Sequence, residues 1–122
     1  FQGAAYDSYT RTVTLEYVGA PENPSGAGTI YIHQRRGDFP QDPNLPSHAT
    51  PVTVAGVTRE YVHGAWIYEP AGTTTPRWDG NADYYSLSWQ KDGISFSIDF
   101  LGGETIPPIQ LNELIAIAES MK

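Results

Sequence analysis

The chain is 122 residues long, carries 14 acidic against 7 basic residues, and contains no cysteine. This length provides one domain with one hydrophobic core. The formal charge of −7 argues against nucleic acid as a partner, because affinity for a phosphate backbone depends on a clustered basic face. The lack of cysteine excludes disulfides and thiolate metal ligands.

The first three residues, Phe1-Gln2-Gly3, match the end of a protease-cleavage linker used in recombinant proteins. We therefore assign the natural domain to residues 4–122, with a native N-terminus of this sequence as the alternative. If the linker interpretation holds, the natural protein extends upstream, where we expect a signal peptide or a membrane anchor. The content of tyrosine, tryptophan, threonine, proline and glycine favours an extracytoplasmic location.

Alternation of apolar and polar residues predicts five strands in the first part of the chain. Glycines mark two of the bends, Gly56 and Gly64. Three segments rich in proline, glycine or serine are predicted loops, because proline cannot donate to a sheet ladder: Gly19–Gly28, Arg35–Pro51 and Pro70–Ala82. The predicted strands are Thr12–Val18, Thr29–Gln34, Val52–Ala55, Thr58–His63 and Ala65–Glu69.

The strongest local signal is a β-hairpin from Asp83 to Leu101. Asp92-Gly93 is a favoured type I′ turn, in which both central residues need positive φ. A turn at this place pairs apolar residues on one face: Tyr85 with Phe100, Leu87 with Ile98, and Trp89 with Phe96. The other face pairs Ser86 with Asp99, Ser88 with Ser97, and Gln90 with Ser95. A shift of the strand register by one residue would place apolar and polar residues on the same face. The turn position and the alternation of residue types therefore support the same register.

A helix is predicted from about Ile109 to Met121, entered through Pro107-Pro108. Its apolar residues form one stripe: Leu111, Leu114, Ile115, Ala118 and Met121. Such a stripe must be buried, and the apolar sheet face is the partner the chain offers. The predicted fold class is therefore α+β, an antiparallel, strongly twisted sheet of about six to seven strands, built from hairpins and meanders and packed on one C-terminal helix.

The standard catalytic signatures are absent from the sequence: a G-x-S-x-G elbow, an H-E-x-x-H helix and a P-loop. We therefore predict no enzyme activity, no catalytic residues and no cofactor. An enzyme would need two titratable groups in one cleft, and Asp99 with His33 on the polar sheet face is the conceivable pair. The hydroxyl-bearing residues of that face are expected to be solvated: Thr12, Thr14, Ser86, Ser88, Ser95 and Ser97.

Metal binding is not predicted either. The three histidines have no second ligand at metal-binding spacing: His33, His48 and His63. Asp79, Asn81 and Asp83 have the spacing of the first three ligands of a calcium loop, but Tyr84 stands where that loop needs glycine. We predict an ordinary polar turn there.

Three residues form the candidate interaction surface: Arg36, Phe39 and Trp78. Arg36 opens Arg36-Gly37-Asp38, which spells the integrin-recognition tripeptide at the mouth of a long loop. Trp78 lies inside a predicted loop, either as a contact residue or as an anchor packed on the sheet. Trp66 is expected to pair with Tyr61 across a hairpin, and Trp89 belongs to the predicted core.

The C-terminal half resembles the extracytoplasmic C-terminal domain of unknown function found in many bacterial anti-sigma-factor and sporulation-associated membrane proteins. The resemblance rests on Leu87-Ser88-Trp89, Asp92-Gly93 and Glu113 to Met121, and more loosely on Val52 to Val57 and Glu60-Tyr61. More distantly, it is similar to lipoprotein-carrier and sigma-regulator sensor domains. The family implies a fold and a compartment, and it supplies no activity and no functional residue.

Together these observations predict a non-catalytic sensory or interaction domain of a bacterial envelope protein, tethered to the membrane upstream. Its partner would be a protein, a peptide or a lipid, bound through a sheet face or through the loop around Arg36 to Pro46. The alternative is a carrier or chaperone that encloses a lipid or another hydrophobic ligand between sheet and helix. An open apolar cleft lined by Trp66, Trp89 and Phe96 would favour the carrier.

Overall fold

The computed structural model describes residues 1–18, 28–39, 45–54, 56–102 and 108–121. Most of the predicted loop Gly19–Gly28, part of Arg35–Pro51, Ala55 and Pro107 lie outside the described residues. Within the described ranges, no helix has both the length and the apolar character needed to cross a membrane.

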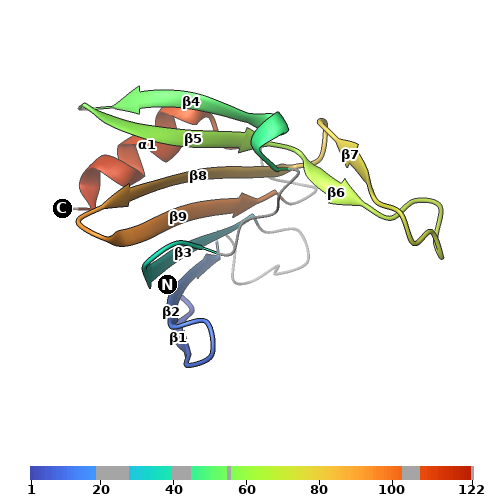
Figure 1. Cartoon of the computed structure of the whole chain (residues 1–122). Coiled ribbons are helices and arrows are strands. Elements are labelled where there is room, and N and C mark those ends of the chain that lie inside the picture. The colour runs from blue at the N-terminus through green and yellow to red at the C-terminus, as the bar shows by residue number, and fades with distance from the viewer. Residues whose placement is uncertain (19–27, 40–44, 55, 103–107, 122) are drawn as a thin grey trace.

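Seven strands form one antiparallel sheet in the order β1-β2-β3-β9-β8-β5-β4, and a single helix follows at the C-terminus (Figure 1). This confirms the predicted α+β class, a largely antiparallel sheet with one C-terminal helix. The elements are β1 (Gly3–Asp7), β2 (Thr12–Val18), β3 (Thr29–Arg36), β4 (Ala49–Val54), β5 (Val57–His63), β8 (Tyr84–Lys91), β9 (Ile94–Leu101) and α1 (Leu111–Ser120).

The topology joins two hairpins and a meander. β1, β2 and β3 pair in sequence, β4 pairs with β5, and β8 pairs with β9. The long-range pairings are β3 with β9 and β5 with β8, so the β8–β9 hairpin lies in the middle of the sheet. The connection from β3 to β4 therefore joins the centre of the sheet to its far edge, and ends in the short 3-10 helix η1 (Leu45–His48).

The β8–β9 hairpin has the predicted register. Tyr85 lies opposite Phe100, Leu87 opposite Ile98, and Trp89 opposite Phe96, while the serines pair on the other face. Asp92 and Gly93 have φ of 54° and 74°, the positive values that a type I′ turn requires. Turn chemistry and alternation were sufficient to place every residue of this hairpin.

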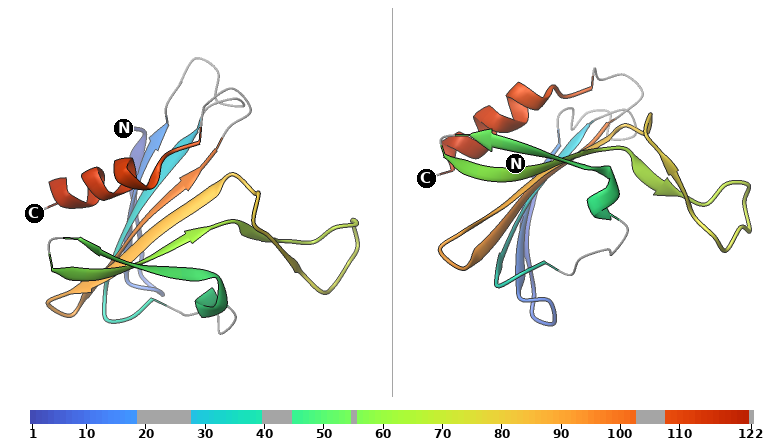
Figure 2. Two further views of the ribbon diagram at one scale, coloured as in Figure 1. Left: turned by 90° about the horizontal axis from the view of Figure 1, so that it is seen from above. Right: turned by 45° about the horizontal axis from the view of Figure 1, so that its top comes forward.

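The core lies between the middle of the sheet and α1. Leu87, Ile98 and Leu114 are fully buried, and Figure 2 shows the helix along one face of the sheet. At its N-terminus the Glu113 carboxylate accepts a hydrogen bond from the Gln110 backbone N–H at 2.7 Å, a reciprocal capping contact. The buried core cluster draws on β8, β9 and α1: Tyr85, Leu87, Trp89, Ile98, Phe100, Leu114 and Ala118.

Several predicted boundaries are wrong. The structure adds β1, extends β3 to Arg36, and starts β4 at Ala49, inside the predicted loop Arg35–Pro51. Pro51 is tolerated in β4 because β4 is an edge strand, where a missing N–H need not break a ladder bond. The helix starts at Leu111 rather than Ile109.

The predicted strand Ala65–Glu69 does not continue the main sheet. Its first part, β6 (Ala65–Ile67), pairs with β7 (Arg77–Asp79) in a separate two-stranded ribbon, so Trp66 lies opposite Trp78 rather than Tyr61. Gly64 redirects the chain with φ of 114°, and a Cβ there would lie 2.6 Å from the Asp79 carbonyl oxygen. Only glycine fits this conformation and this close approach. β7 also replaces part of the predicted loop Pro70–Ala82.

Candidate functional site

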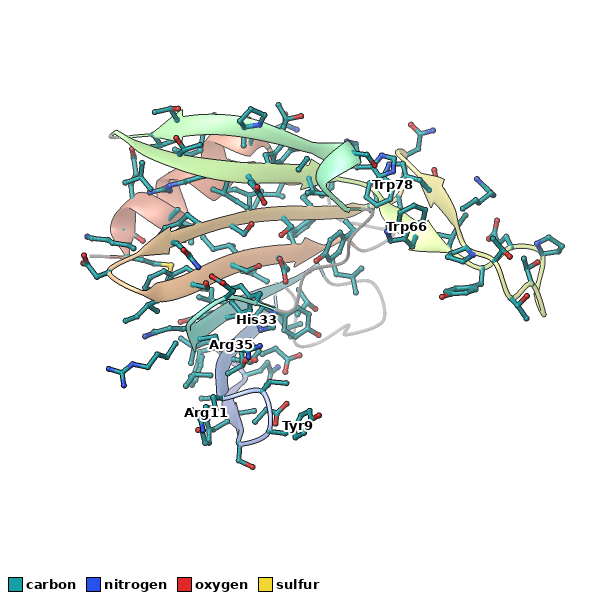
Figure 3. All side chains as sticks on the ribbon, viewed as in Figure 1. Tyr9, Arg11, His33, Arg35, Trp66 and Trp78 are labelled. Atoms are coloured by element: carbon teal, nitrogen blue, oxygen red, sulfur yellow. The ribbon has the colours of Figure 1, made fainter. Side chains whose placement is uncertain are left out.

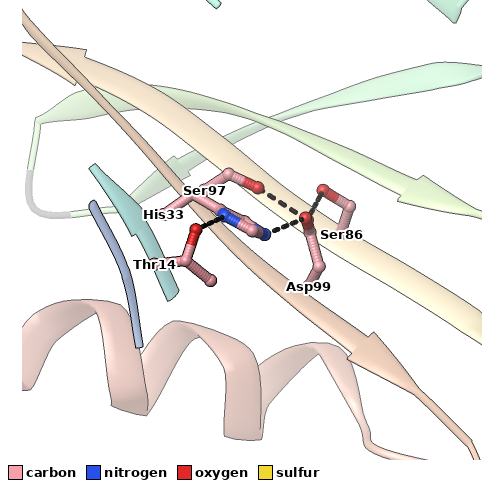
Figure 4. A network of polar contacts seen from close by, with 5 residues as sticks. All are labelled: Thr14, His33, Ser86, Ser97 and Asp99. Carbon is pink, nitrogen blue, oxygen red and sulfur yellow. Dashed lines mark hydrogen bonds and ion pairs between the residues drawn. The ribbon is translucent and has the colours of Figure 1, made fainter. Parts of the chain in front are cut away.

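The face of the sheet opposite α1 carries a hydrogen-bonded polar network drawn from four neighbouring strands (Figure 4). His33 of β3 lies between Thr14 of β2 and Asp99 of β9. His33 Nδ1 is 2.9 Å from Thr14 Oγ1, and His33 Nε2 is 3.2 Å from Asp99 Oδ2. The hydroxyls of Ser86 and Ser97 each donate to Asp99 Oδ1 at 2.6 Å. The carboxylate is thus the centre of the network.

Burial and hydrogen bonding act on Asp99 in opposite directions. Burial would raise the pKa of its carboxyl, but the hydrogen bonds from His33, Ser86 and Ser97 outweigh burial and hold that pKa below its ordinary value. Burial also raises the pKa of the neighbouring Tyr84 hydroxyl, and the negative charge of Asp99 raises it further. Asp99 is therefore the group that stays ionised at neutral pH.

The arrangement of Thr14, His33 and Asp99 has the order of a hydroxyl–imidazole–carboxylate relay, the pairing that an enzyme would need. A relay alone does not perform acyl transfer, because the developing oxyanion also needs preorganised donors. β2, β3, β9 and β8 each have a strand on both sides, so the sheet ladder uses their backbone N–H groups. Ser86 and Ser97 donate to the carboxylate rather than to His33. In the described residues, the His33 imidazole and the two serine hydroxyls all contact the Asp99 carboxylate.

The predicted solvation of the hydroxyl face is wrong at two positions. The register does place the six hydroxyl-bearing residues on one face, but Ser95 and Ser97 are only 3% and 8% exposed. Chain from the β3–β4 connection reaches this face, because the Gln90 side chain donates both to the Asp38 carboxylate and to Ser95 Oγ. Alternation shows which residues share a face, and it does not show what covers that face.

A second cluster joins the β6–β7 ribbon to η1. The Trp66 and Trp78 rings lie 5.3 Å apart at 76°, and the His48 ring stacks on Trp78 with centroids 4.1 Å apart. Figure 3 shows both tryptophans at the base of the ribbon, where it leaves the sheet. Further out, Tyr68 is 59% exposed, and Arg77 pairs with Glu69 at 3.3 Å. The ribbon therefore has an aromatic base and an exposed polar and aromatic end.

The structure separates Trp78 from Arg36, two of the three residues predicted to form an interaction surface. Arg36 ends β3 opposite Ile94, beside the β8–β9 turn, whereas Trp78 lies in the ribbon that begins beside Tyr84. β8 runs between these two places and is roughly 25 Å long. Arg36 is exposed, and Phe39 and Trp78 are half-buried. Trp78 is an anchor in the aromatic cluster, and it lies in a strand rather than in a loop.

The integrin-like tripeptide is held against the β8–β9 turn. Gly37 N–H donates to the Gly93 carbonyl oxygen at 2.9 Å, and Asp38 accepts the hydrogen bond from Gln90. A segment fixed to a neighbouring turn in this way is not the tight, freely displayed loop that such recognition needs.

The histidines have three different environments. His33 belongs to the polar network, His48 to the aromatic cluster, and His63 stacks on Tyr85 with centroids 4.3 Å apart. Asp79 Oδ1 accepts the Asn81 backbone N–H at 3.0 Å, which closes a local turn. In the part of the chain that the structure describes, no three His, Asp or Glu side chains gather where they could hold a metal ion.

Sequence reasoning missed the role of His48 and the exposed position of Tyr68. No local pattern connects His48 with two tryptophans that follow it by 18 and 30 residues.

Comparisons with known protein families, with curated proteins and with solved structures find no match to this chain.

Proposed function

We propose that this domain is a non-catalytic, extracytoplasmic sensory or interaction domain of a bacterial envelope protein, with a link to anti-sigma regulation. The acidic, cysteine-free composition and the resemblance of the C-terminal half to domains of such membrane proteins support this proposal. It includes a membrane anchor upstream of the domain. It also assigns different roles to two parts of the domain. The twisted sheet and α1 form a packed body, and a separate element makes the contact with the partner.

The β6–β7 ribbon is the observation that carries the proposal. It projects away from the sheet (Figures 1 and 2), and its residues contribute nothing to the core cluster. A two-stranded ribbon is marginally stable by itself, and the three rings of His48, Trp66 and Trp78 supply the packing that holds it. These three side chains hold the ribbon away from the sheet. The best explanation of this arrangement is that the ribbon makes the contact with a partner.

An extended segment of a partner protein is the ligand that the ribbon suits best. Because the ribbon has two strands, each strand keeps one edge without a partner strand in its sheet. Backbone groups at such an edge can pair with an added strand, and neighbouring side chains then provide selectivity. Tyr68, just beyond β6, offers an exposed aromatic contact next to the edge.

The packing between the sheet and α1 argues against a carrier. Leu87 and Ile98 from the sheet and Leu114 from α1 are fully buried, so these side chains fill the space between sheet and helix. Trp66, which an open apolar cleft would include, lies in the ribbon instead. The observations therefore favour an interaction domain over a hydrophobic carrier.

Site-specific photo-crosslinking tests the proposal. A photoreactive phenylalanine derivative is placed at Tyr68, or at Tyr9 as a control, in the full-length protein in its native cells. Tyr9 is 95% exposed and lies in the β1–β2 turn, away from the ribbon. We expect a discrete protein adduct from Tyr68 and none from Tyr9. Equal adducts from both positions, or none from either, would contradict a contact made through the ribbon.

A further inference from the structure

Of the three rings that hold the β6–β7 ribbon, only the His48 imidazole can carry a charge. The imidazole and the Trp78 indole are stacked, with centroids 4.1 Å apart and planes inclined by 7°. Trp66 stands nearly perpendicular to this pair, with its centroid 5.4 Å from that of His48 and 5.3 Å from that of Trp78. Both tryptophans belong to the ribbon and His48 belongs to η1, so the stack attaches the ribbon to a residue outside it.

The stacking geometry makes this attachment sensitive to the charge of His48. The face of an indole attracts a cation that lies within about 6 Å of the ring centroid, and tryptophan is the strongest aromatic partner. The His48 ring is well inside this range and parallel to the Trp78 face. A neutral imidazole gains only ring stacking there, whereas an imidazolium adds the attraction of its charge to the indole. Protonation of His48 therefore strengthens the contact with Trp78.

The surroundings of His48 limit the cost of charging it. The residue is half-buried, and neither of its ring nitrogens is among the sealed, unpartnered side-chain atoms of the described residues. Each nitrogen thus reaches solvent or a hydrogen-bond partner, and the added N–H is not left in a dry, apolar site.

In the described part of the ribbon, no titratable side chain is directed at His48. β6 contains none, and β7 carries Arg77 and Asp79 on either side of Trp78. Alternation along the strand turns both side chains to the face opposite the tryptophan. Arg77 is also paired with Glu69 at 3.3 Å. The ribbon therefore offers His48 its indole rings rather than a charged group.

His63 is the other histidine at this end of the sheet, and it provides an internal control. β4 begins at Ala49, opposite Val62, so His48 and His63 lie at the same end of the β4–β5 pair. The His63 ring stacks on Tyr85 of β8, with centroids 4.3 Å apart, and does not contact an indole. A charge on His63 consequently acts on the main sheet and not on the ribbon.

We propose that His48 and Trp78 form a pH-sensitive clamp, in which protonation of the imidazole holds the ribbon more firmly in its projecting position. Stability that depends on a protonated group is present in acid and is lost as the pH rises. The ribbon is therefore held most firmly below the pH range in which histidine titrates, and more loosely above it. The regulatory value of the clamp rests on the proposed role of the ribbon in partner contact, but the clamp itself can be tested without a partner.

Hydrogen exchange of the isolated chain at two pH values tests the clamp. Amide protection factors, which correct for the intrinsic effect of pH on exchange, are measured by NMR for β6 and β7. We expect ribbon protection to rise about fivefold from about pH 8 to about pH 5, the size of a partly exposed cation–π contact. Slow exchange of the β8 and β9 amides in every variant shows that the body is still folded.

Variants assign the rise to the clamp. H48F keeps an aromatic ring on Trp78 but cannot gain a proton, so its ribbon protection should not change with pH. H48Q lacks both ring and charge and should likewise show no rise, even where H48F packs poorly. H63F retains the clamp and should keep the full rise. No rise in the parent chain, an equal rise in H48F and H48Q, or loss of the rise in H63F would overturn the proposal.

The clamp and the proposed function can fail separately. A partner adduct from Tyr68 in a chain whose ribbon shows no pH response would refute the clamp and leave the partner contact standing. A fivefold response without any adduct would support the clamp and refute the partner contact.

Discussion

Replacing Leu114 with alanine is expected to lower the free energy of unfolding by about 2–5 kcal/mol, the range for truncating a buried leucine. Leu114 is 0% exposed and lies in the core cluster with Leu87 and Ile98, so the substitution removes apolar contacts and leaves a cavity. Urea unfolding followed by circular dichroism measures the loss.

The matched control for this substitution is L101A. Leu101 ends β9 on the face opposite α1 and is 51% exposed, so its truncation should change the free energy of unfolding by no more than about 0.5 kcal/mol. Equal effects of L114A and L101A would mean that α1 does not pack on the sheet.

The second large effect is expected for D99N. The Asp99 carboxylate accepts hydrogen bonds from Ser86 and Ser97 and pairs with His33, and an amide places its NH2 group where one of those acceptors stood. Leaving a buried donor unsatisfied costs about 1–3 kcal/mol, which urea unfolding at pH 7 would measure. D92N is the control, because Asp92 is exposed and its positive φ suits asparagine equally well.

The effect of D99N should depend on pH in a defined direction. The pKa of Asp99 is lower in the folded protein than its ordinary value, so its ionisation contributes stability above the unfolded-state pKa of about 4. That contribution is lost as the pH falls through the lower, folded-state pKa. The difference between the parent chain and D99N should therefore be largest near neutral pH and shrink in acid. A difference that grows below pH 4 would contradict the assigned role.

Local sequence chemistry predicted the centre of this fold well. Asp92-Gly93 sets the turn, and the alternation on either side sets which residues face α1, so the hairpin register follows from neighbouring residues alone. The helix was also predictable, because Leu114 and Ala118 share one stripe and need an apolar partner. Both features depend on residues that are close together in the sequence.

The errors arise where distant segments meet. The sequence predicts a bend at Gly64, but only the approach of Asp79 and Trp78 shows that the chain leaves the main sheet there. His48 carries no local signal of its contact with Trp78. The sequence indicates that His33 and Asp99 share the polar face, whereas the contact of Asp38 with Gln90, beside the buried Ser95, joins segments far apart in the sequence. These features depend on contacts between residues that are far apart in the sequence. No local pattern in a single sequence indicates such contacts.

The molecule has two parts, a packed body and an exposed arm. The body is the sheet with α1, held by the core cluster on one face and by the Asp99 network on the other. The arm is the β6–β7 ribbon, which is attached through Gly64 and the rings of Trp66 and Trp78. If the arm makes the partner contact, changes in it should alter binding while leaving the stability of the body largely intact.

Native-state hydrogen exchange tests this division most directly. We expect amides of β8, β9 and α1 to exchange slowest and with one common free energy, because they open only when the whole body unfolds. Amides of β6 and β7 should exchange faster, through a local opening that leaves the core protected. Exchange of α1 together with the ribbon, while β8 and β9 remain protected, would contradict a body in which helix and sheet stabilise each other.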